Sequence, residues 1–185
     1  MTMNNRAWSV LEIKSLDDEQ RVITGIATTP STDRVGDIVE PMGARYEREI
    51  PLLWQHSHGD PVGYAELGKA TKAGIPFKAK IERLDEDGDL KRLLDKAWQS
   101  VKLKLVRGVS IGFRAIKYDI MSEGGIRFTD TEIYELSLVT IPANAQATIT
   151  TVKQFDGGRT LVNGGIPLVK VQREVPKDFV RLVSP

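Results

Sequence analysis

The sequence predicts a mainly β fold of the α+β type, in which a small closed β-barrel is flanked by helices. Three observations lead to this fold class. Roughly the first 150 residues divide into short apolar segments separated by turn-forming residues. One stretch has the longer period of an amphipathic helix. Hydrophobic residues make up 41% of the 185 residues, which is enough apolar material for one core.

Six segments before the helix are predicted as strands, because each is apolar or β-branched and is bounded by turn residues. They cover residues 8–14, 21–28, 33–40, 51–55, 61–66 and 75–81. Gly36 is a candidate bulge in the third. In the sixth, Ile75, Phe77, Ala79 and Ile81 alternate with Pro76, Lys78 and Lys80. This period of two predicts a strand with one buried face.

Residues 90–105 are predicted as the helix. One face carries Leu90, Leu93, Leu94, Ala97, Trp98, Val101 and Leu105. Asp87 or Asp89 is expected to cap the N-terminus, and Gly108 is expected to end the helix.

Strands resume after the helix. From residue 109, Val109 and Ile111 face one way while Ser110 and Gly112 face the other. Residues 123–125 predict a turn between strands, and 131–141 is the last long strand. It is apolar on both faces, as a buried strand is, and Pro142 ends it.

The composition changes after about Phe155, where Gly-Gly pairs and turn residues replace the strand pattern. We therefore expect one folded domain over residues 1–155 and a linker and tail over 156–185.

Charge and residue content exclude several classes of protein. The net charge is +1, so no strong field attracts nucleic acid or an anionic membrane. No apolar run approaches the ~20 residues of a membrane span, which predicts a soluble, cytoplasmic protein. Without cysteine there are no disulfides, thiolate zinc sites or cysteine nucleophiles. No phosphate-binding loop or dinucleotide fingerprint occurs, and no cofactor is expected.

Only two histidines are present, so any histidine chemistry uses His56 or His58. His56 follows an apolar strand and precedes a polar loop, which suits a base at the rim of a cleft. A surface histidine without function is the alternative. A serine needs such a base to become a nucleophile, and His56 with Ser110 is the most economical hydrolytic pair. The alternative for Ser110 is a strand serine on the solvent face.

Glu135 lies inside an apolar strand, where a carboxylate needs a partner. An imidazole that it orients is one such partner, as in a catalytic triad. An ion pair with Arg107 or Arg114 is an equally good explanation from the residues alone.

Two segments resemble metal sites in composition but lack a full set of ligands. The acidic segment 85–89 lacks the final bidentate glutamate of a calcium loop. His56 and His58 lack further clustered ligands.

Four segments together resemble the prohead proteases of tailed phages, distant relatives of the herpesvirus protease assemblin. They are Asp33-Arg34-Val35-Gly36-Asp37-Ile38-Val39, Leu52-Leu53-Trp54-Gln55-His56 with Pro61-Val62-Gly63, Val109-Ser110-Ile111-Gly112-Phe113, and Glu135-Leu136-Ser137-Leu138-Val139-Thr140-Ile141-Pro142-Ala143-Asn144. Their order and separation, with the helix between the second and third, make the resemblance specific. Many relatives carry an acidic residue where this chain has Ser57.

The resemblance implies an assemblin-like barrel and a serine endopeptidase that works through an acyl-enzyme. Ser110 would be the nucleophile, His56 the general base and Glu135 the third member. By analogy, the backbone of Ala143 and Asn144 would supply oxyanion-hole amides.

The implied substrates are the scaffolding protein or the scaffolding segment of the major capsid protein, and the protease itself. The implied location is the immature capsid inside the bacterial host, and a homodimer is a further expectation. An inactive structural or scaffolding β-domain is the competing hypothesis, and a metal-binding module at His56 and His58 is a third.

Overall fold

The computed structural model describes residues 12–16 and 20–154, and the structural statements below concern these residues. The elements in order are β1 (Glu12–Leu16), β2 (Val22–Thr28), β3 (Ile38–Val39), the 3-10 turn η1 (Pro41–Gly43), β4 (Ala44–Tyr46), β5 (Glu49–Trp54), β6 (Ser57–Leu67), β7 (Ile75–Ile81), α1 (Asp89–Lys102), β8 (Gly108–Ile120), β9 (Ile126–Val139) and β10 (Ile149–Gln154). The predicted tail, 156–185, lies outside the described residues.

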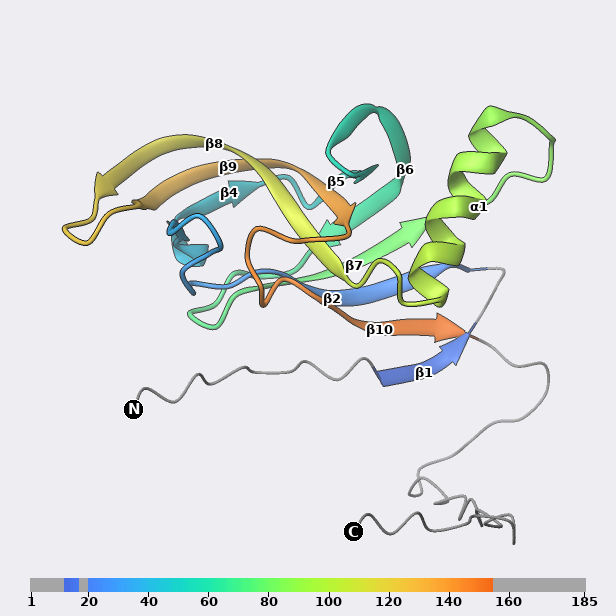
Figure 1. Ribbon diagram of the computed structural model, residues 1–185, viewed down its shortest axis with the longest axis horizontal. Coiled ribbons are helices and arrows are strands. Elements are labelled where there is room, and N and C mark those ends of the chain that lie inside the picture. The colour runs from blue at the N-terminus through green and yellow to red at the C-terminus, as the bar shows by residue number, and fades with distance from the viewer. Residues whose placement is uncertain (1–11, 17–19, 155–185) are drawn as a thin grey trace, which may run out of the picture.

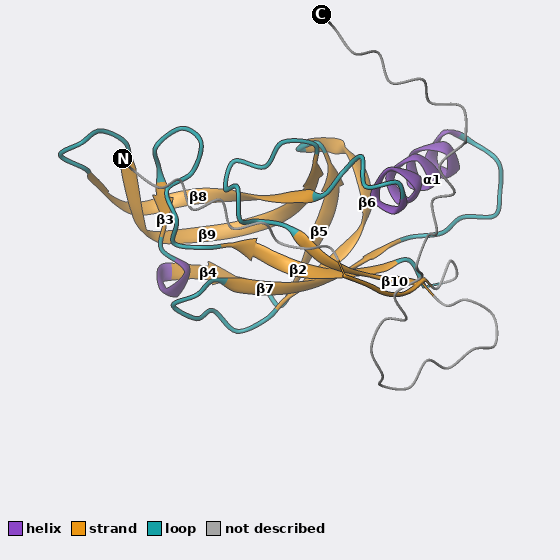
Figure 2. Cartoon of the chain, turned by 60° about the horizontal axis from the view of Figure 1, so that its bottom comes forward, coloured by secondary structure: helices purple, strands orange, loops and turns teal. Residues whose placement is uncertain are grey.

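The strands form one long, twisted sheet that stays open. Its order is β1-β10-β2-β7-β6-β5-β9-β3, with β4 and β8 also pairing with β9. Mainly β is therefore correct, but the closed barrel flanked by helices is wrong. The strands at the two ends of the order, β1 and β3, do not pair with each other, and the described residues contain a single α-helix. Figure 2 shows the sheet nearly edge-on with α1 at one end.

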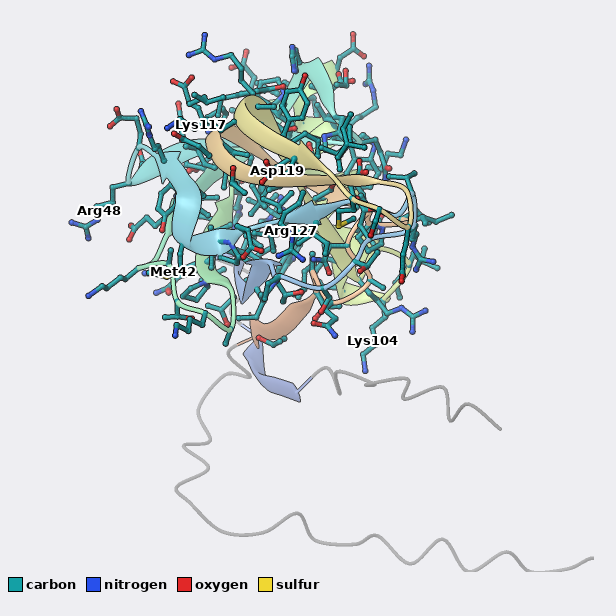
Figure 3. The ribbon with its side chains drawn as sticks, turned by 90° about the vertical axis from the view of Figure 1, so that its left-hand side faces the viewer. Met42, Arg48, Lys104, Lys117, Asp119 and Arg127 are labelled. Carbon is teal, nitrogen blue, oxygen red and sulfur yellow. The ribbon has the colours of Figure 1, made fainter. Side chains whose placement is uncertain are left out.

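The β8–β9 hairpin extends away from the helix. It forms the long arch in Figure 1, and its turn lies at the opposite end of the molecule from α1. The predicted turn at residues 123–125 is confirmed, because Gly124 and Gly125 adopt φ of +89° and +83°. Figure 3 looks onto this end and labels the charged side chains of Lys117, Asp119 and Arg127.

The core lies between the sheet and the helix. On β7 the four predicted apolar side chains are buried and the three between them are exposed, so the predicted alternation is confirmed. On α1, Leu94, Ala97, Trp98 and Val101 are buried. All eight of these apolar side chains belong to one cluster with residues of β2, β5, β6 and β9.

The ends of the helix differ from the prediction. The N-cap is Gly88, which offers no side-chain hydrogen bond, and neither predicted aspartate caps the helix. Asp89 instead pairs with Arg92 one turn along. The helix ends at Lys102, so Leu105 of the predicted apolar stripe lies outside it, and both Leu105 and Leu90 are exposed rather than buried. Gly108 begins β8.

The predicted strand at 33–40 is reduced to Ile38–Val39. The Asp33 carboxylate accepts the backbone N–H of Val35 at 2.8 Å and of Asp37 at 2.9 Å. These local bonds compete with strand pairing and fold the segment into a tight turn.

Candidate active site

His56 lies in the two-residue turn between β5 and β6. Trp54 and Ser57 are paired, so Gln55 and His56 form the turn, with φ of +52° and +59°. Two consecutive positive φ values suit a hairpin of this length, although glycine or asparagine usually supplies them. The segment after His56, predicted as a polar loop, instead begins β6. A histidine held in this conformation indicates that its surroundings compensate for the strain.

Contacts with β9 and with Thr140, the residue after it, provide that compensation. The Gln55 N–H donates to the carbonyl of Leu138 at 3.0 Å, and the Gln55 amide donates to Thr140 Oγ1 at 3.1 Å. The His56 N–H donates to Ser137 Oγ at 3.1 Å. The turn is therefore fixed to one strand, although its sequence neighbours lie on β5 and β6.

Glu135 of β9 is 2% exposed, and both of its carboxylate oxygens accept a hydrogen bond. Oε1 lies 2.7 Å from His56 Nδ1, and Oε2 accepts from Ser137 Oγ at 2.8 Å. An ionised carboxylate only accepts, so His56 Nδ1 carries the proton. Nε2 is then left with a free lone pair, which is the tautomer that a general base needs.

The alternative of an ion pair between Glu135 and an arginine is not seen among the described residues. Arg114 pairs with Glu132 instead. The buried carboxylate therefore has an imidazole partner, which was the first of the two explanations.

Gly112 of β8 makes room for that carboxylate. A Cβ added at Gly112 would lie 2.2 Å from Glu135 Oε1 and 2.6 Å from its Cγ. The Glu135 side chain thus crosses directly over this glycine, its partner on the adjacent strand.

Ser110 is on β8 and its Cα partner on β9 is Ser137. Side chains that face each other across a strand pair, and those two residues along, share one face of the sheet. Ser110, Gly112, Glu135 and Ser137 therefore lie on one face, against which His56 rests. The described residues show no hydrogen bond from Ser110 Oγ to the His56 ring. Ser110 is only 8% exposed, so it is not the solvent-facing serine of the alternative.

A cavity of about 40 Å³ adjoins Ser110. Ile111 and Phe113 line it from β8, and Ala143 and Asn144 line it from the loop after β9. It is large enough for about three water molecules or one short side chain.

Arg34 holds this loop in place. The side-chain Nε of Arg34 donates to the carbonyl of Pro142 at 2.9 Å, and its backbone N–H donates to the carbonyl of Ala143 at 3.1 Å. The N–H groups of Ala143 and Asn144 find no acceptor in the described part of the chain. The two predicted oxyanion residues thus lie beside Ser110 with their donors unused.

The outer edge of β8 is open beyond Val109. The Val109 N–H donates to the carbonyl of Ala147 at 3.1 Å. Leu138, the partner of Val109 on β9, accepts instead from the Gln55 N–H. Val109 and Leu138 are therefore a pair without hydrogen bonds to each other. Alternation along an antiparallel ladder then turns the backbone groups of Ile111 outward as well. Within the described residues β8 pairs with β9 alone, so the N–H and C=O of Ile111 have no strand partner.

Residues 11–158 match the family described as caudovirus prohead serine protease. The chain belongs to this family. The family predicted from the sequence is thereby confirmed, and serine protease is the class of enzyme that its description names.

Three relatives agree with this family. The chain is 52% identical over 170 residues to a capsid polyprotein of Pseudomonas phage PAJU2, an alignment that covers 90% of the chain and 26% of that protein. It is 28% identical over 159 residues to the prohead protease of Escherichia phage T5, covering 78% of the chain and 71% of the relative. It is also 28% identical over 155 residues to the prohead protease of Enterobacteria phage HK97, covering 78% of the chain and 66% of the relative. The chain thus spans about a quarter of the capsid polyprotein.

Other candidate sites gain no support. The His58 ring meets the edge of Tyr134 at a centroid distance of 6.4 Å. Among the described residues, no three His, Cys, Asp or Glu side chains gather as metal ligands. None of the helices described is long and apolar enough to span a membrane.

Sequence reasoning missed Ser137, which touches both His56 and Glu135. One feature of the sequence could have indicated Ser137: it is a second polar residue two positions from Glu135, on the same face of an otherwise apolar strand.

Proposed function

We propose that this chain is a serine endopeptidase with Ser110 as nucleophile, His56 as general base and Glu135 as the group that orients the imidazole. The 2.7 Å contact between His56 Nδ1 and Glu135 is the observation that carries the proposal. A buried carboxylate that hydrogen-bonds to a half-exposed imidazole is typical of a histidine that acts as a catalytic base.

The reaction follows from these roles. Ser110 Oγ attacks the scissile carbonyl carbon while its proton passes to His56 Nε2. The tetrahedral intermediate collapses, the C–N bond breaks, and Nε2 returns the proton to the leaving amine. A water molecule then attacks the acyl-enzyme by the same route and frees Ser110.

Ser110 and His56 must come within hydrogen-bond reach for this reaction. His56 rests against the sheet face that carries Ser110, and Ser110 faces the strand position that binds the His56 backbone. Catalytic hydrogen bonds are often long in the absence of substrate and shorten when it binds.

Stabilisation of the oxyanion is assigned to unused backbone donors around Ser110. Ala143 and Asn144 present two such N–H groups. Ile111, the residue after the nucleophile, lines the same cavity and turns its N–H outward. Donors fixed in advance by the backbone stabilise developing negative charge without reorganisation.

The open edge of β8 supports a polypeptide substrate. An extended segment can add to an unpaired strand edge through main-chain hydrogen bonds. A segment added beyond Val109 would pass Ile111, next to Ser110, and its carbonyl groups would approach the cavity. This geometry favours cleavage of an extended region of a protein.

The substrates we propose are the scaffolding segment of the major capsid protein, or a separate scaffolding protein, and this chain itself. The names of the relatives, capsid polyprotein and prohead protease, support substrates connected with the capsid. The proposed location is the immature capsid within the bacterial host, and a homodimer is proposed as the active form.

Co-expression with the cognate capsid protein tests the assignment. Processing by the wild type is expected to disappear in Ser110→Ala and His56→Ala, and to fall by roughly 10⁴-fold in Glu135→Gln. The matched controls are Ser122→Ala, in the exposed β8–β9 turn, and His58→Ala; both are expected to process normally.

The alternative, an inactive structural or scaffolding domain, is favoured by the absence of a Ser110–His56 hydrogen bond. If the domain is inactive, any processing of the capsid protein is carried out by another protease and continues unchanged in Ser110→Ala. That outcome would remove Ser110 from the mechanism.

A further inference from the structure

We propose that Ser137 is the positioning residue of this site, binding the His56 backbone and the Glu135 carboxylate with one hydroxyl. The catalytic role of Ser137 rests on the proposed function, whereas its hydrogen bonds to His56 and Glu135 are independent of that proposal. Neither the sequence reasoning nor the family description assigns a role to this serine.

Three hydrogen bonds close a ring through Ser137. The His56 N–H donates to Ser137 Oγ at 3.1 Å, and the Ser137 hydroxyl donates to Glu135 Oε2 at 2.8 Å. Glu135 Oε1 accepts from His56 Nδ1 at 2.7 Å and completes the ring. The two bonds through Ser137 run head to tail, from the His56 N–H through the hydroxyl to the Glu135 carboxylate, an arrangement in which neighbouring bonds strengthen one another.

His56 needs such an anchor because packing alone does not hold it. Its side chain is 44% exposed, and its backbone has φ of +59° in a two-residue turn. Gln55 ties the turn to β9 but does not touch the imidazole ring. Ser137 ties the backbone of His56 to the same carboxylate that holds the ring, so ring and backbone keep one orientation.

Ser137 also relates the base to the nucleophile. It is 0% exposed and is the Cα partner of Ser110 on the neighbouring strand. Because it is fully buried, it cannot contact substrate. Its loss should therefore slow the chemical step and leave substrate binding unchanged.

The test measures the reaction of Ser110 with a fluorophosphonate probe in the full-length chain. In Ser137→Ala the maximal rate of labelling is expected to fall by about 10–100-fold, as when the hydrogen-bond partner behind an active-site group is removed. The probe concentration at half-maximal rate is expected to stay constant. If Ser137→Ala does not fold, Ser137→Cys keeps the volume, weakens both bonds, and should show the same fall in rate.

Thr131→Val is the matched control. Thr131 is also 0% exposed on β9, but its hydroxyl has no hydrogen-bond partner. The control removes a buried hydroxyl from the same strand and is expected to label at the wild-type rate. Equal rates in Ser137→Ala and Thr131→Val would overturn the proposal.

Proton NMR gives a readout that does not need proteolysis. The His56 Nδ1–H bonded to Glu135 is expected as a low-field signal, present in Ser110→Ala and in Thr131→Val but lost through exchange in Ser137→Ala. If the signal follows this pattern while no form labels, the positioning role stands and the protease assignment fails. If the signal persists in Ser137→Ala, the positioning role is wrong whatever the activity.

Discussion

Glu135 carries its carboxylate across Gly112, so the absence of a side chain at one position decides whether the acid can reach His56. The described glycines differ in this respect, because an added Cβ meets a close neighbour at some positions and none at others. Gly88, for example, has no heavy atom within 4 Å of an added Cβ. The Glu135 carboxylate occupies the space that Gly112 leaves.

Gly112→Ala is therefore expected to displace Glu135 and break its bond to His56. Overpacking of this kind costs about 1–3 kcal/mol in the free energy of unfolding. Labelling of Ser110 should fall by roughly 10³–10⁴-fold, close to the effect of Glu135→Gln, because both changes leave the imidazole without its orienting group. Gly88→Ala is the control, and wild-type labelling in Gly112→Ala would show that Glu135 has another route to His56.

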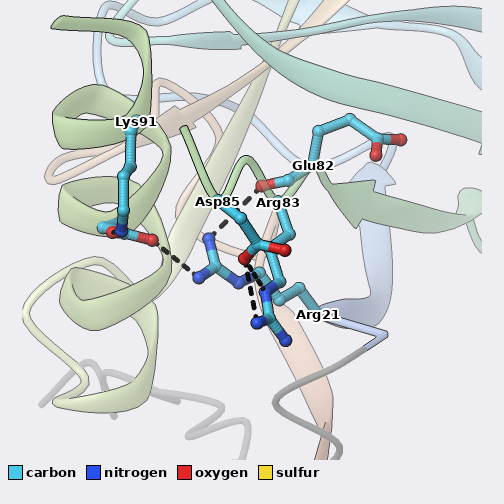
Figure 4. Close-up of polar contacts among 6 residues, drawn as sticks. Arg21, Glu82, Arg83, Asp85 and Lys91 are labelled. Atoms are coloured by element: carbon cyan, nitrogen blue, oxygen red, sulfur yellow. Dashed lines mark hydrogen bonds and ion pairs between the residues drawn. The ribbon is translucent and has the colours of Figure 1, made fainter. Parts of the chain in front are cut away.

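At the scale of elements, one buried arginine joins the helix to the sheet. Arg21, just before β2, donates to Asp95 Oδ1 of α1 at 2.6 Å and to the carbonyl of Glu82 at 3.3 Å. Lys91 adds a bond to Asp95 Oδ2 at 2.6 Å. Figure 4 shows Arg21 reaching between the segment after β7 and the helix. Lys91 lies on α1 itself, so it is Arg21 that attaches the helix to the sheet by charge, in addition to the packing of its apolar face.

The hydrogen bonds from Lys91 and then Arg21 lower the pKa of Asp95 below its ordinary value. A carboxyl with a lowered folded-state pKa stabilises the protein fully above the unfolded pKa of about 3.9, and this contribution is lost as the pH falls through the lower folded value. Asp95 is partly exposed, so solvent screens its ion pairs, and Asp95→Asn is expected to reduce the free energy of unfolding by about 1 kcal/mol at pH 7.

Urea unfolding of Asp95→Asn and the wild type across pH 2.5–7 checks this prediction, which expects the two stabilities to converge below about pH 4. Asp87→Asn, an exposed aspartate before the helix, is the control. A difference that stays constant down to the lowest pH would show that the Asp95 charge is not what attaches the helix.

At the scale of the molecule, the buried apolar residues that we describe all lie between Val22 and Ile149. The family match also ends at residue 158. A chain shortened to end at Gly158 is therefore expected to unfold at the same urea concentration as the full chain and to label at the same rate.

A chain ending at Val139 is the contrasting variant. It lacks β10, which lies between β1 and β2 in the sheet, and is expected not to fold. A loss of stability in the chain that ends at Gly158 would place part of the core beyond residue 158. That result would contradict the predicted domain boundary.

Elements with a local pattern can be predicted from the sequence alone. The alternation of β7 and the apolar stripe of α1 each follow from burial of one face, which neighbouring residues reveal through their spacing. The scarcity of histidine and the absence of cysteine reduced the candidate chemistry to a few residues. The residues that carry the family resemblance were likewise visible in the chain.

The pairing of distant residues, in contrast, becomes visible once the chain is folded. His56 and Glu135 are 79 positions apart, and their contact depends on β5 lying beside β9 in the sheet. The same order leaves β8 with one neighbour and the sheet open, which overturned the closed barrel. Strand order and register are set by the sum of many distant hydrogen bonds and packing contacts, and local spacing does not contain them. The roles of Gly112 and Ser137 exist only once that register brings them against Glu135.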